Sequence, residues 1–267
     1  MALFDSLLFS VDHTINTADL IFGRATCRTR WGSVPARHQK RGKRTVNAKV
    51  SKSRVARRGP SAQRDPERTR AAILAAATQE FTAKGLSGAR VDTIAKRAGI
   101  NKRMLYHYFG DKEGLYLAVL EATYAAIRTA EVGLNLRDLG PVDGMRKLVL
   151  FTWQYFIDHP EFLSLLSSEN MLRADYLKRS KRIRHLHAPL VGMISELLER
   201  GVKEKAFRSG IDPIDLYITI ASLGFFYMSN RFTLSTIFGK DLGTPERLET
   251  RGRHIVEVVL AYLAPRN

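Results

Sequence analysis

The sequence of 267 residues predicts an all-α protein with nine helices. From residue 66 onward, apolar residues recur at intervals of three and four, a spacing that places them on one face of a helix. The same stretch lacks the alternation of apolar and polar residues that is typical of half-buried strands. Glycine and proline residues separate the periodic segments and mark where the expected helices begin and end.

The first expected helix shows how each range is assigned. Ile73, Ala77 and Phe81 form its apolar stripe, and Gly85 ends it. In the seventh helix, Pro189 predicts a kink or a break, because proline removes a backbone hydrogen bond and crowds the preceding turn. In chain order, the expected helices span about residues 66–84, 91–98, 102–109, 112–132, 142–158, 161–173, 176–204, 213–230 and 245–264.

The segment from Arg90 to Lys112 predicts two short helices joined by a tight turn. Gly99 suits the left-handed conformation that ends the first helix, and Asn101 is a favourable N-cap for the second. Leu105 and Phe109, four residues apart, turn one face of the second helix toward the core. The outward face then carries Lys102, Arg103, Met104, Tyr106 and His107. This arrangement is typical of the recognition helix of a helix-turn-helix, although a solvated helix face is the alternative.

Five segments in the first half of the chain carry a family resemblance. They are I-L-A-A-A-T-Q-E-F (73–81), K-G-L (84–86), D-T-I-A-K-R-A-G-I (92–100), L-Y-H-Y-F (105–109) and D-K-E-G-L-Y-L-A-V-L (111–120). In order and spacing they resemble the DNA-binding domain of the TetR family of transcriptional regulators. The resemblance implies a nine-helix fold with a helix-turn-helix head, residues 63–127, and a ligand-sensing and dimerisation body, residues 128–267.

The resemblance also implies which residues contact DNA. Arginine and lysine donate to guanine or to phosphates, and a methionine contacts the thymine methyl group. A small residue is usual in the family at Arg103 and a hydroxyl residue at Met104, so the operator sequence is not predicted. For Arg90 a solvated charge is an alternative to a phosphate contact. The expected DNA-binding residues are Arg90, Asn101, Lys102, Arg103, Met104, Tyr106, His107, Tyr108 and Lys112.

The positive charge is concentrated near the start of the chain. The formal net charge is +17, and residues 1–70 contribute a surplus of 11 cations while residues 71–267 contribute 6. Residues 1–62 are therefore expected to form a disordered basic leader, which either adds affinity for DNA phosphates or is simply solvated. Because the character of the sequence changes near Gln63, we also consider that the assigned start is over-extended.

The body is expected to bind an unidentified small molecule. The resemblance implies a pocket between the fourth and seventh helices, and such pockets combine apolar walls with a few polar groups. The candidate ligand contacts are Trp153, Phe156, Phe162, Asn170, His185 and Phe225, with a purely structural core as the alternative for each aromatic residue. His185 and His187 lie two residues apart and diverge on a helix, so no metal site is expected. No catalytic constellation is recognisable, so we expect neither an enzyme nor a cofactor.

The two helices expected at 213–230 and 245–264 are apolar on more than one side. The resemblance implies that they form the interface of a homodimer, whereas an internal core pair is the alternative. A two-fold dimer would bind a near-palindromic operator on double-stranded DNA.

The longest apolar run, residues 216–228, is shorter than the roughly 20 residues that span a bilayer. Together with the resemblance, this leads us to expect a cytoplasmic, nucleoid-associated repressor that a small molecule releases, or alternatively an activator or a non-specific DNA-binding protein.

Overall fold

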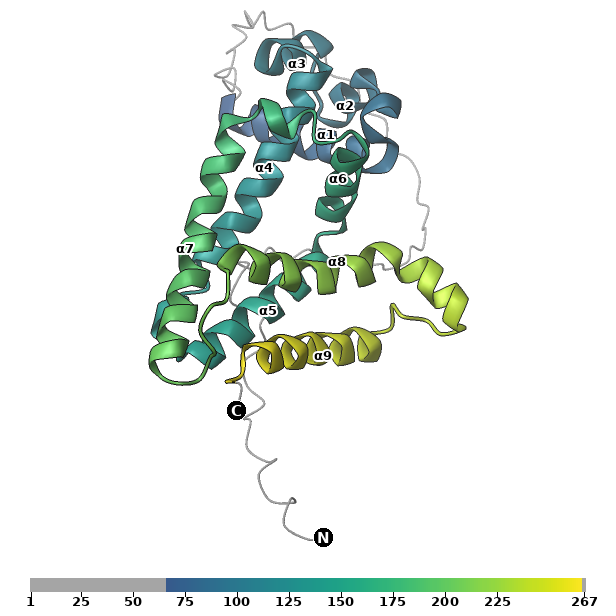
Figure 1. Cartoon of the computed structure of the whole chain (residues 1–267). Helices are drawn as coiled ribbons and strands as arrows, with labels where there is room; N and C mark the ends of the chain where they lie inside the picture. The colour runs from purple at the N-terminus through teal and green to yellow at the C-terminus, as the bar shows by residue number, and fades with distance from the viewer. Residues whose placement is uncertain (1–65, 266–267) are drawn as a thin grey trace, which may run out of the picture. The chain divides into compact units, whose positions relative to one another are not determined.

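The computed structural model describes residues 66–265, so the expectations for residues 1–62 lie outside the described residues. Within this range the chain forms nine α-helices and two short 3-10 turns, with no strand (Figure 1). The helices are α1 Pro66–Gly88, α2 Val91–Arg97, α3 Lys102–Phe109, α4 Lys112–Val132, α5 Pro141–Asp158, α6 Pro160–Met171, α7 Lys181–Lys203, α8 Pro213–Phe238 and α9 Pro245–Leu263. The turns are η2 Leu136–Asp138 and η3 Leu177–Arg179. The prediction of an all-α fold with nine helices is confirmed for the described part of the chain.

The start of α7 differs from the predicted range. The sequence suggested one helix from residue 176, but residues 177–179 form a 3-10 turn and α7 begins at Lys181. Ser180 is extended, and its hydroxyl accepts a hydrogen bond from the Ile183 N–H at 3.2 Å, which makes it the N-cap. Further along, α7 continues through Pro189 as one helix, so proline does not divide it.

The end of α8 also differs from the prediction. The helix was expected to stop near residue 230, yet it continues to Phe238. No glycine or proline interrupts residues 231–238, and Gly239 ends the helix with a left-handed φ of 61°. The additional turns carry exposed aromatic and aliphatic side chains, and these turns extend the apolar surface of α8.

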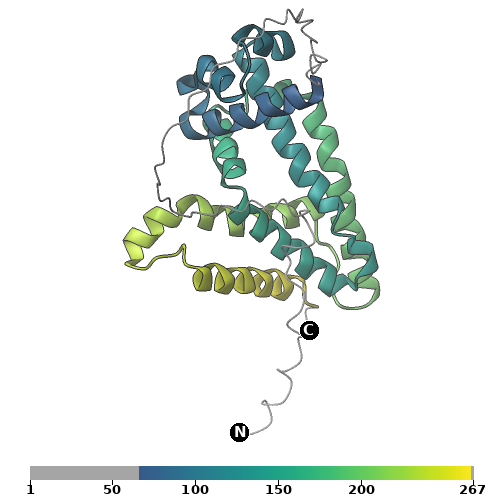
Figure 2. The same ribbon diagram turned by 180° about the vertical axis from the view of Figure 1, so that it is seen from behind.

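Two hydrophobic cores hold the described residues together, and α4 contributes to both. Leu115, Val119 and Leu120 lie in the first core with α1, α2 and α3, whereas Ile127 lies in the second core with α5, α7, α8 and α9. Both views show α4 descending from the helix-turn-helix alongside α7 (Figures 1 and 2). A displacement of α4 therefore affects both cores, because buried side chains are close-packed.

The centre of the second core is Trp153 on α5, and two glycines allow α8 and α9 to approach it. A Cβ atom on Gly252 would lie 2.8 Å from Trp153 Cδ1, and one on Gly224 would lie 3.0 Å from Phe156 Cδ2. The indole N–H of Trp153 donates to the Leu248 carbonyl at 3.1 Å, which satisfies its one polar group. These contacts place α8 and α9 against α5. None of the helices from residue 66 to residue 265 is long and apolar enough to cross a membrane.

Candidate nucleic-acid interface

The helix α3 is held by one cap and by its inward side chains. The Asn101 side chain accepts a hydrogen bond from the Arg103 N–H at 2.9 Å, as predicted for an N-cap. Leu105 is fully buried, Phe109 is half-buried, and the guanidinium of Arg70 lies 5.2 Å from the centre of the Phe109 ring. These contacts fix which face of α3 is turned to solvent.

The outward face of α3 carries most of the side chains that the sequence placed there. Lys102, Arg103, Tyr106 and His107 are exposed, while Met104 and Tyr108 are half-buried. The rings of His107 and Tyr108 make an edge contact, with 5.7 Å between their centres. Two cations, a phenol and an imidazole are therefore presented together on one short helix.

The two cations of α3 have different surroundings. Lys102 Nζ lies 2.9 Å from an Asp92 carboxylate oxygen on α2, and the hydrogen bond to Asp92 raises the pKa of Lys102. Within residues 66–265, the side chain of Arg103 forms no ion pair or hydrogen bond, and its backbone N–H donates to the Asn101 side chain. Arg103 can therefore reach a ligand without breaking a side-chain contact in this part of the chain, whereas Lys102 must first leave Asp92.

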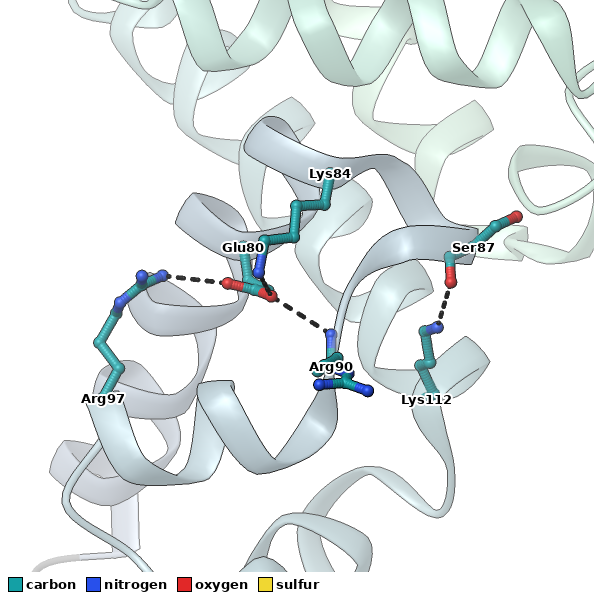
Figure 3. A network of polar contacts seen from close by, with 6 residues as sticks. All are labelled: Glu80, Lys84, Ser87, Arg90, Arg97 and Lys112. Carbon is teal, nitrogen blue, oxygen red and sulfur yellow. Dashed lines mark hydrogen bonds and ion pairs between the residues drawn. The ribbon is translucent and has the colours of Figure 1, made fainter.

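A buried carboxylate, Glu80 of α1, joins α1 to both ends of α2 (Figure 3). Its oxygens lie 2.8 Å from Lys84 Nζ and 3.6 Å from Arg97 Nη1, and one of them accepts from the Arg90 N–H at 3.3 Å. The hydrogen bond from Lys84 holds the pKa of Glu80 below its usual value, against the opposing effect of burial. The sequence prediction did not include this network. A signal was present, because Glu80 follows Ile73 and Ala77 on the buried stripe of α1.

The expected phosphate contacts lie where the end of α1 and the start of α2 approach the start of α4. Lys112 Nζ donates to the Ser87 carbonyl oxygen at 3.2 Å, and Lys112 is half-buried. Asp111 caps α4 by accepting from the Gly114 N–H at 2.6 Å. Arg90 is exposed, and its guanidinium points away from Glu80 (Figure 3). The amide groups at the start of α4 attract an anion, and Lys112 adds a positive charge beside them.

The candidate ligand contacts in the body do not form one group. Trp153, Phe156 and Phe162 are buried in the second core, and Phe225 packs partly buried against it. Asn170 and His185 are exposed, and the Asn170 amide donates to the Leu166 carbonyl of its own helix at 2.9 Å. The four aromatic residues therefore belong to the second core or pack against it, and the two polar candidates lie on the surface.

A buried charge pair on α4 was not predicted. Arg128 and Glu131 are 5% and 0% exposed, with Nη1 and Oε2 3.0 Å apart, and Arg128 Nη2 donates to the Tyr217 hydroxyl of α8 at 3.0 Å. Burial raises the pKa of Glu131 to about 7, although the nearby Arg128 opposes this change. The Glu131 Oε1 and Arg128 Nε atoms have no hydrogen-bond partner within residues 66–265. The signal was again positional, since Arg128 and Glu131 share the inward stripe of Tyr124.

Comparison with known proteins identifies both halves of the described chain. The model of bacterial regulatory proteins of the tetR family matches residues 73–119, and that of the tetracyclin repressor-like C-terminal domain matches residues 141–259. The HTH-type transcriptional repressor NicS of Pseudomonas putida is 40% identical over 176 residues, which cover 66% of this chain and 83% of NicS. The HTH-type transcriptional repressor SCO4008 of Streptomyces coelicolor is 31% identical over 202 residues, covering 73% of this chain and 99% of that protein.

Solved structures agree with this assignment. The transcriptional regulator SCO4942 of Streptomyces coelicolor superposes with a TM-score of 0.56 at 26% identity, covering 74% of this chain and 99% of that one. A tetR-family regulatory protein from Rhodococcus RHA1 gives a TM-score of 0.58 at 18% identity and covers 74% and 98% of the two chains, which shows a common fold. The helix-turn-helix with its capped outward-facing helix, the helical body and these relatives together show that the chain belongs to the TetR family of transcriptional regulators.

Proposed function

We propose that the protein is a sequence-specific repressor, which binds its operator through α3 and leaves it when a small molecule binds the body. This proposal rests on the outward face of α3. That face presents Arg103, Tyr106 and His107 to solvent, while the buried side chain of Leu105 packs the opposite face against the core. Two relatives are named as transcriptional repressors, which supports repression rather than activation. We assign residues 63–127 to the DNA-binding head and residues 128–267 to the body, and we place the protein with the chromosome in the bacterial cytosol.

The proposed DNA contacts of the helix-turn-helix and the start of α4 divide into base readout and phosphate binding. Arg103 is assigned to a base edge, since an arginine donating to guanine O6 and N7 discriminates by about 1–3 kcal/mol. Lys112 and Arg90 are assigned to phosphates, which position the protein without reading sequence. Lys102, Met104, Tyr106, His107 and Tyr108 complete the contact surface, with Asn101 as the cap that holds it.

We propose a homodimer that forms through α8 and α9. Ile214, Ile218 and Phe232 are exposed on α8 at intervals of 4 and 14 residues, close to whole turns of a helix. On α9, Val258 and Tyr262 are exposed at a spacing of four residues. An apolar face of this extent, with its other side already packed on α5, is typical of a subunit interface. A two-fold axis there pairs two recognition helices on a near-palindromic operator.

Release by an effector is assigned to α4, because this helix joins the two cores. The Arg128–Glu131 pair and its bond to Tyr217 connect the lower half of α4 to α8. The effector is assigned to this buried polar region and to the aromatic residues Trp153, Phe156, Phe162 and Phe225 of the second core, rather than to the exposed Asn170 and His185. For release, the effector must bind the DNA-incompetent state more tightly than the DNA-bound state. Equal operator affinity of the apo and effector-saturated dimers contradicts this part of the proposal.

The DNA-binding proposal is tested by selecting bound fragments from the source genome and titrating them with two variants. Arg103→Ala should relax the preference at one base position, whereas Lys112→Ala should weaken all sequences alike and reduce the salt slope by about 0.9. A uniform loss of affinity in Arg103→Ala would remove its base-reading role. If the wild-type protein binds all fragments equally, the alternative of a non-specific DNA-binding protein replaces the proposal. Transcription from the selected promoter with and without the protein separates a repressor from an activator.

A further inference from the structure

A dense group of cations lies at the junction of α6 and α7, outside the helix-turn-helix. Residues 173–184 contain six arginine and lysine residues and one aspartate, and all six cations are exposed. This basic segment comprises Arg173, Lys178, Arg179, Lys181, Arg182 and Arg184. Its surplus of 5 charges accounts for most of the surplus of 6 carried by residues 71–267. The remainder of the described chain is therefore close to neutral, and the basic segment is a local feature.

The basic segment is fixed to the DNA-binding head. Ile183 is buried in the first core, and Leu177 packs against that core. The ring of Tyr176 meets that of Tyr116 on α4 edge to face at 5.2 Å. The hydroxyl of Ser180 donates to Glu121 of α4 at 2.6 Å. Although the segment follows α6 in the chain, these contacts make it part of the surface of the head.

The position of the segment on the head is next to an expected phosphate contact. Arg179 Nη1 lies 3.2 Å from a carboxylate oxygen of Glu113, the residue that follows Lys112 in the first turn of α4. Both views show the upper end of α7 beside the beginning of α1, at the level of the head (Figures 1 and 2). Duplex DNA carries one negative charge per roughly 1.7 Å of its axis, so a phosphate at Lys112 has close neighbours along the backbone.

Neither ion pairs with acidic residues nor the stability of α7 explains why the basic segment carries so many cations. Arg179 pairs with Glu113 and Lys178 lies 3.7 Å from Asp175, but within residues 66–265 no ion pair engages the other four. Lys181, Arg182 and Arg184 occupy the first turn of α7, which contains no acidic residue. Positive charges at the beginning of a helix oppose its dipole and lower its stability. Three of them together are therefore unfavourable in the free protein and require another reason.

We propose that the basic segment is a second DNA-contacting surface, which binds backbone phosphates that flank the part of the operator read by α3. This inference rests on the proposed function, because it requires the head to dock on duplex DNA. The charge of the segment is complementary to the phosphate backbone, and its rigid attachment to the head fixes its position on the duplex. The segment adds affinity and lengthens the footprint, and it carries no sequence information.

The test compares two triple variants on mixed-sequence duplexes of 20 and 40 base pairs, because phosphate contacts do not require the operator. The test variant is Lys181→Gln, Arg182→Gln and Arg184→Gln, which keeps good helix formers in α7. The matched control is Lys147→Gln, Lys203→Gln and Lys205→Asn, which removes three exposed cations of the body. Asparagine is chosen at Lys205 because this residue has a φ of 58°, which asparagine tolerates.

We expect wild type to bind the longer duplex more tightly than the shorter one. If all three cations contact phosphates, the test variant should reduce the salt slope of DNA binding by about 2.7 per protomer. The control variant should keep the wild-type slope and the gain on the longer duplex. The midpoint of thermal unfolding of the test variant should not fall, since the cations oppose the α7 dipole. A test variant with the wild-type slope on both duplexes overturns the inference. Equal affinity of wild type for selected genomic fragments and mixed sequence instead overturns the proposed function.

Discussion

Replacing Glu131 with glutamine tests whether the buried charge pair of α4 makes the stability of the protein depend on pH. Glu131 is fully buried, and burial raises the pKa of its carboxyl from an ordinary value of 4.5 to about 7. The folded protein therefore holds this proton more tightly than the unfolded chain does. It follows that the contribution of Glu131 to stability is fully present below pH 4.5 and is lost as the pH rises through about 7.

The size of the effect follows from the shift in pKa. One unit corresponds to about 1.4 kcal/mol, so the full window is worth roughly 3 kcal/mol and the interval from pH 5 to pH 8 about 2.5 kcal/mol. Wild-type protein should lose this much free energy of unfolding between the two pH values because of Glu131 alone. In Glu131→Gln this contribution is absent, so its free energy of unfolding should change less over the same interval.

The assay is urea unfolding at pH 5, 6, 7 and 8, at one protein concentration because the protein is proposed to be a dimer. The control is Glu199→Gln, which removes an exposed carboxylate of α7 without touching the buried pair. The control should follow the pH dependence of wild type. If Glu131→Gln and wild type lose the same free energy between pH 5 and pH 8, the buried carboxyl does not titrate in this window and the reasoning is wrong.

Three further predictions concern the cap of α3, the packing of α7 and the dimer. Asn101→Ala should destabilise α3 by about 1 kcal/mol and weaken operator binding about five-fold in a titration, while Asn101→Ser should bind like wild type. Gly201→Ala should lower the thermal midpoint because its methyl group overlaps the Phe207 ring, whereas Gly192→Ala, with open space around it, should raise stability by about 1 kcal/mol; equal shifts would contradict the packing. Ile218→Glu with Phe232→Glu should sediment as a monomer and Val132→Glu, an exposed site on α4, as a dimer; a dimeric double variant would show that α8 is not in the interface.

The helix-turn-helix could be predicted from the sequence because its determinants are local. Asn101 caps α3 through the N–H of Arg103, two residues away, and Gly99 adopts a left-handed φ of 65° at the end of the turn. The spacing of Leu105 and Phe109 then decides which face of α3 turns inward. Such signals act within one or two helical turns, and the backbone conformation that they favour is the one observed.

The boundaries that were predicted wrongly depend on less specific signals. Ser180 is a favourable N-cap residue, but the apolar periodicity does not show that α7 begins there, and its hydroxyl also donates to Glu121, which is 59 residues away in the sequence. At the end of α8, no glycine or proline follows residue 230 before Gly239, and the helix continues to that glycine. In both places the helix boundary is set by a hydrogen bond or by a glycine, and the spacing of apolar residues gives no information on either.

By itself, the sequence determined the all-α class, the helix-turn-helix and most of the side chains on the outward face of α3, because periodicity and capping are properties of neighbouring residues. Only the tertiary structure decided which partners the buried charges have. Glu80 is joined to the start of α2 ten residues later, and Arg128 bonds Tyr217, which is 89 residues away. A charge on a buried stripe is visible in the sequence, but its pKa depends on desolvation and on partners that only folding brings within reach.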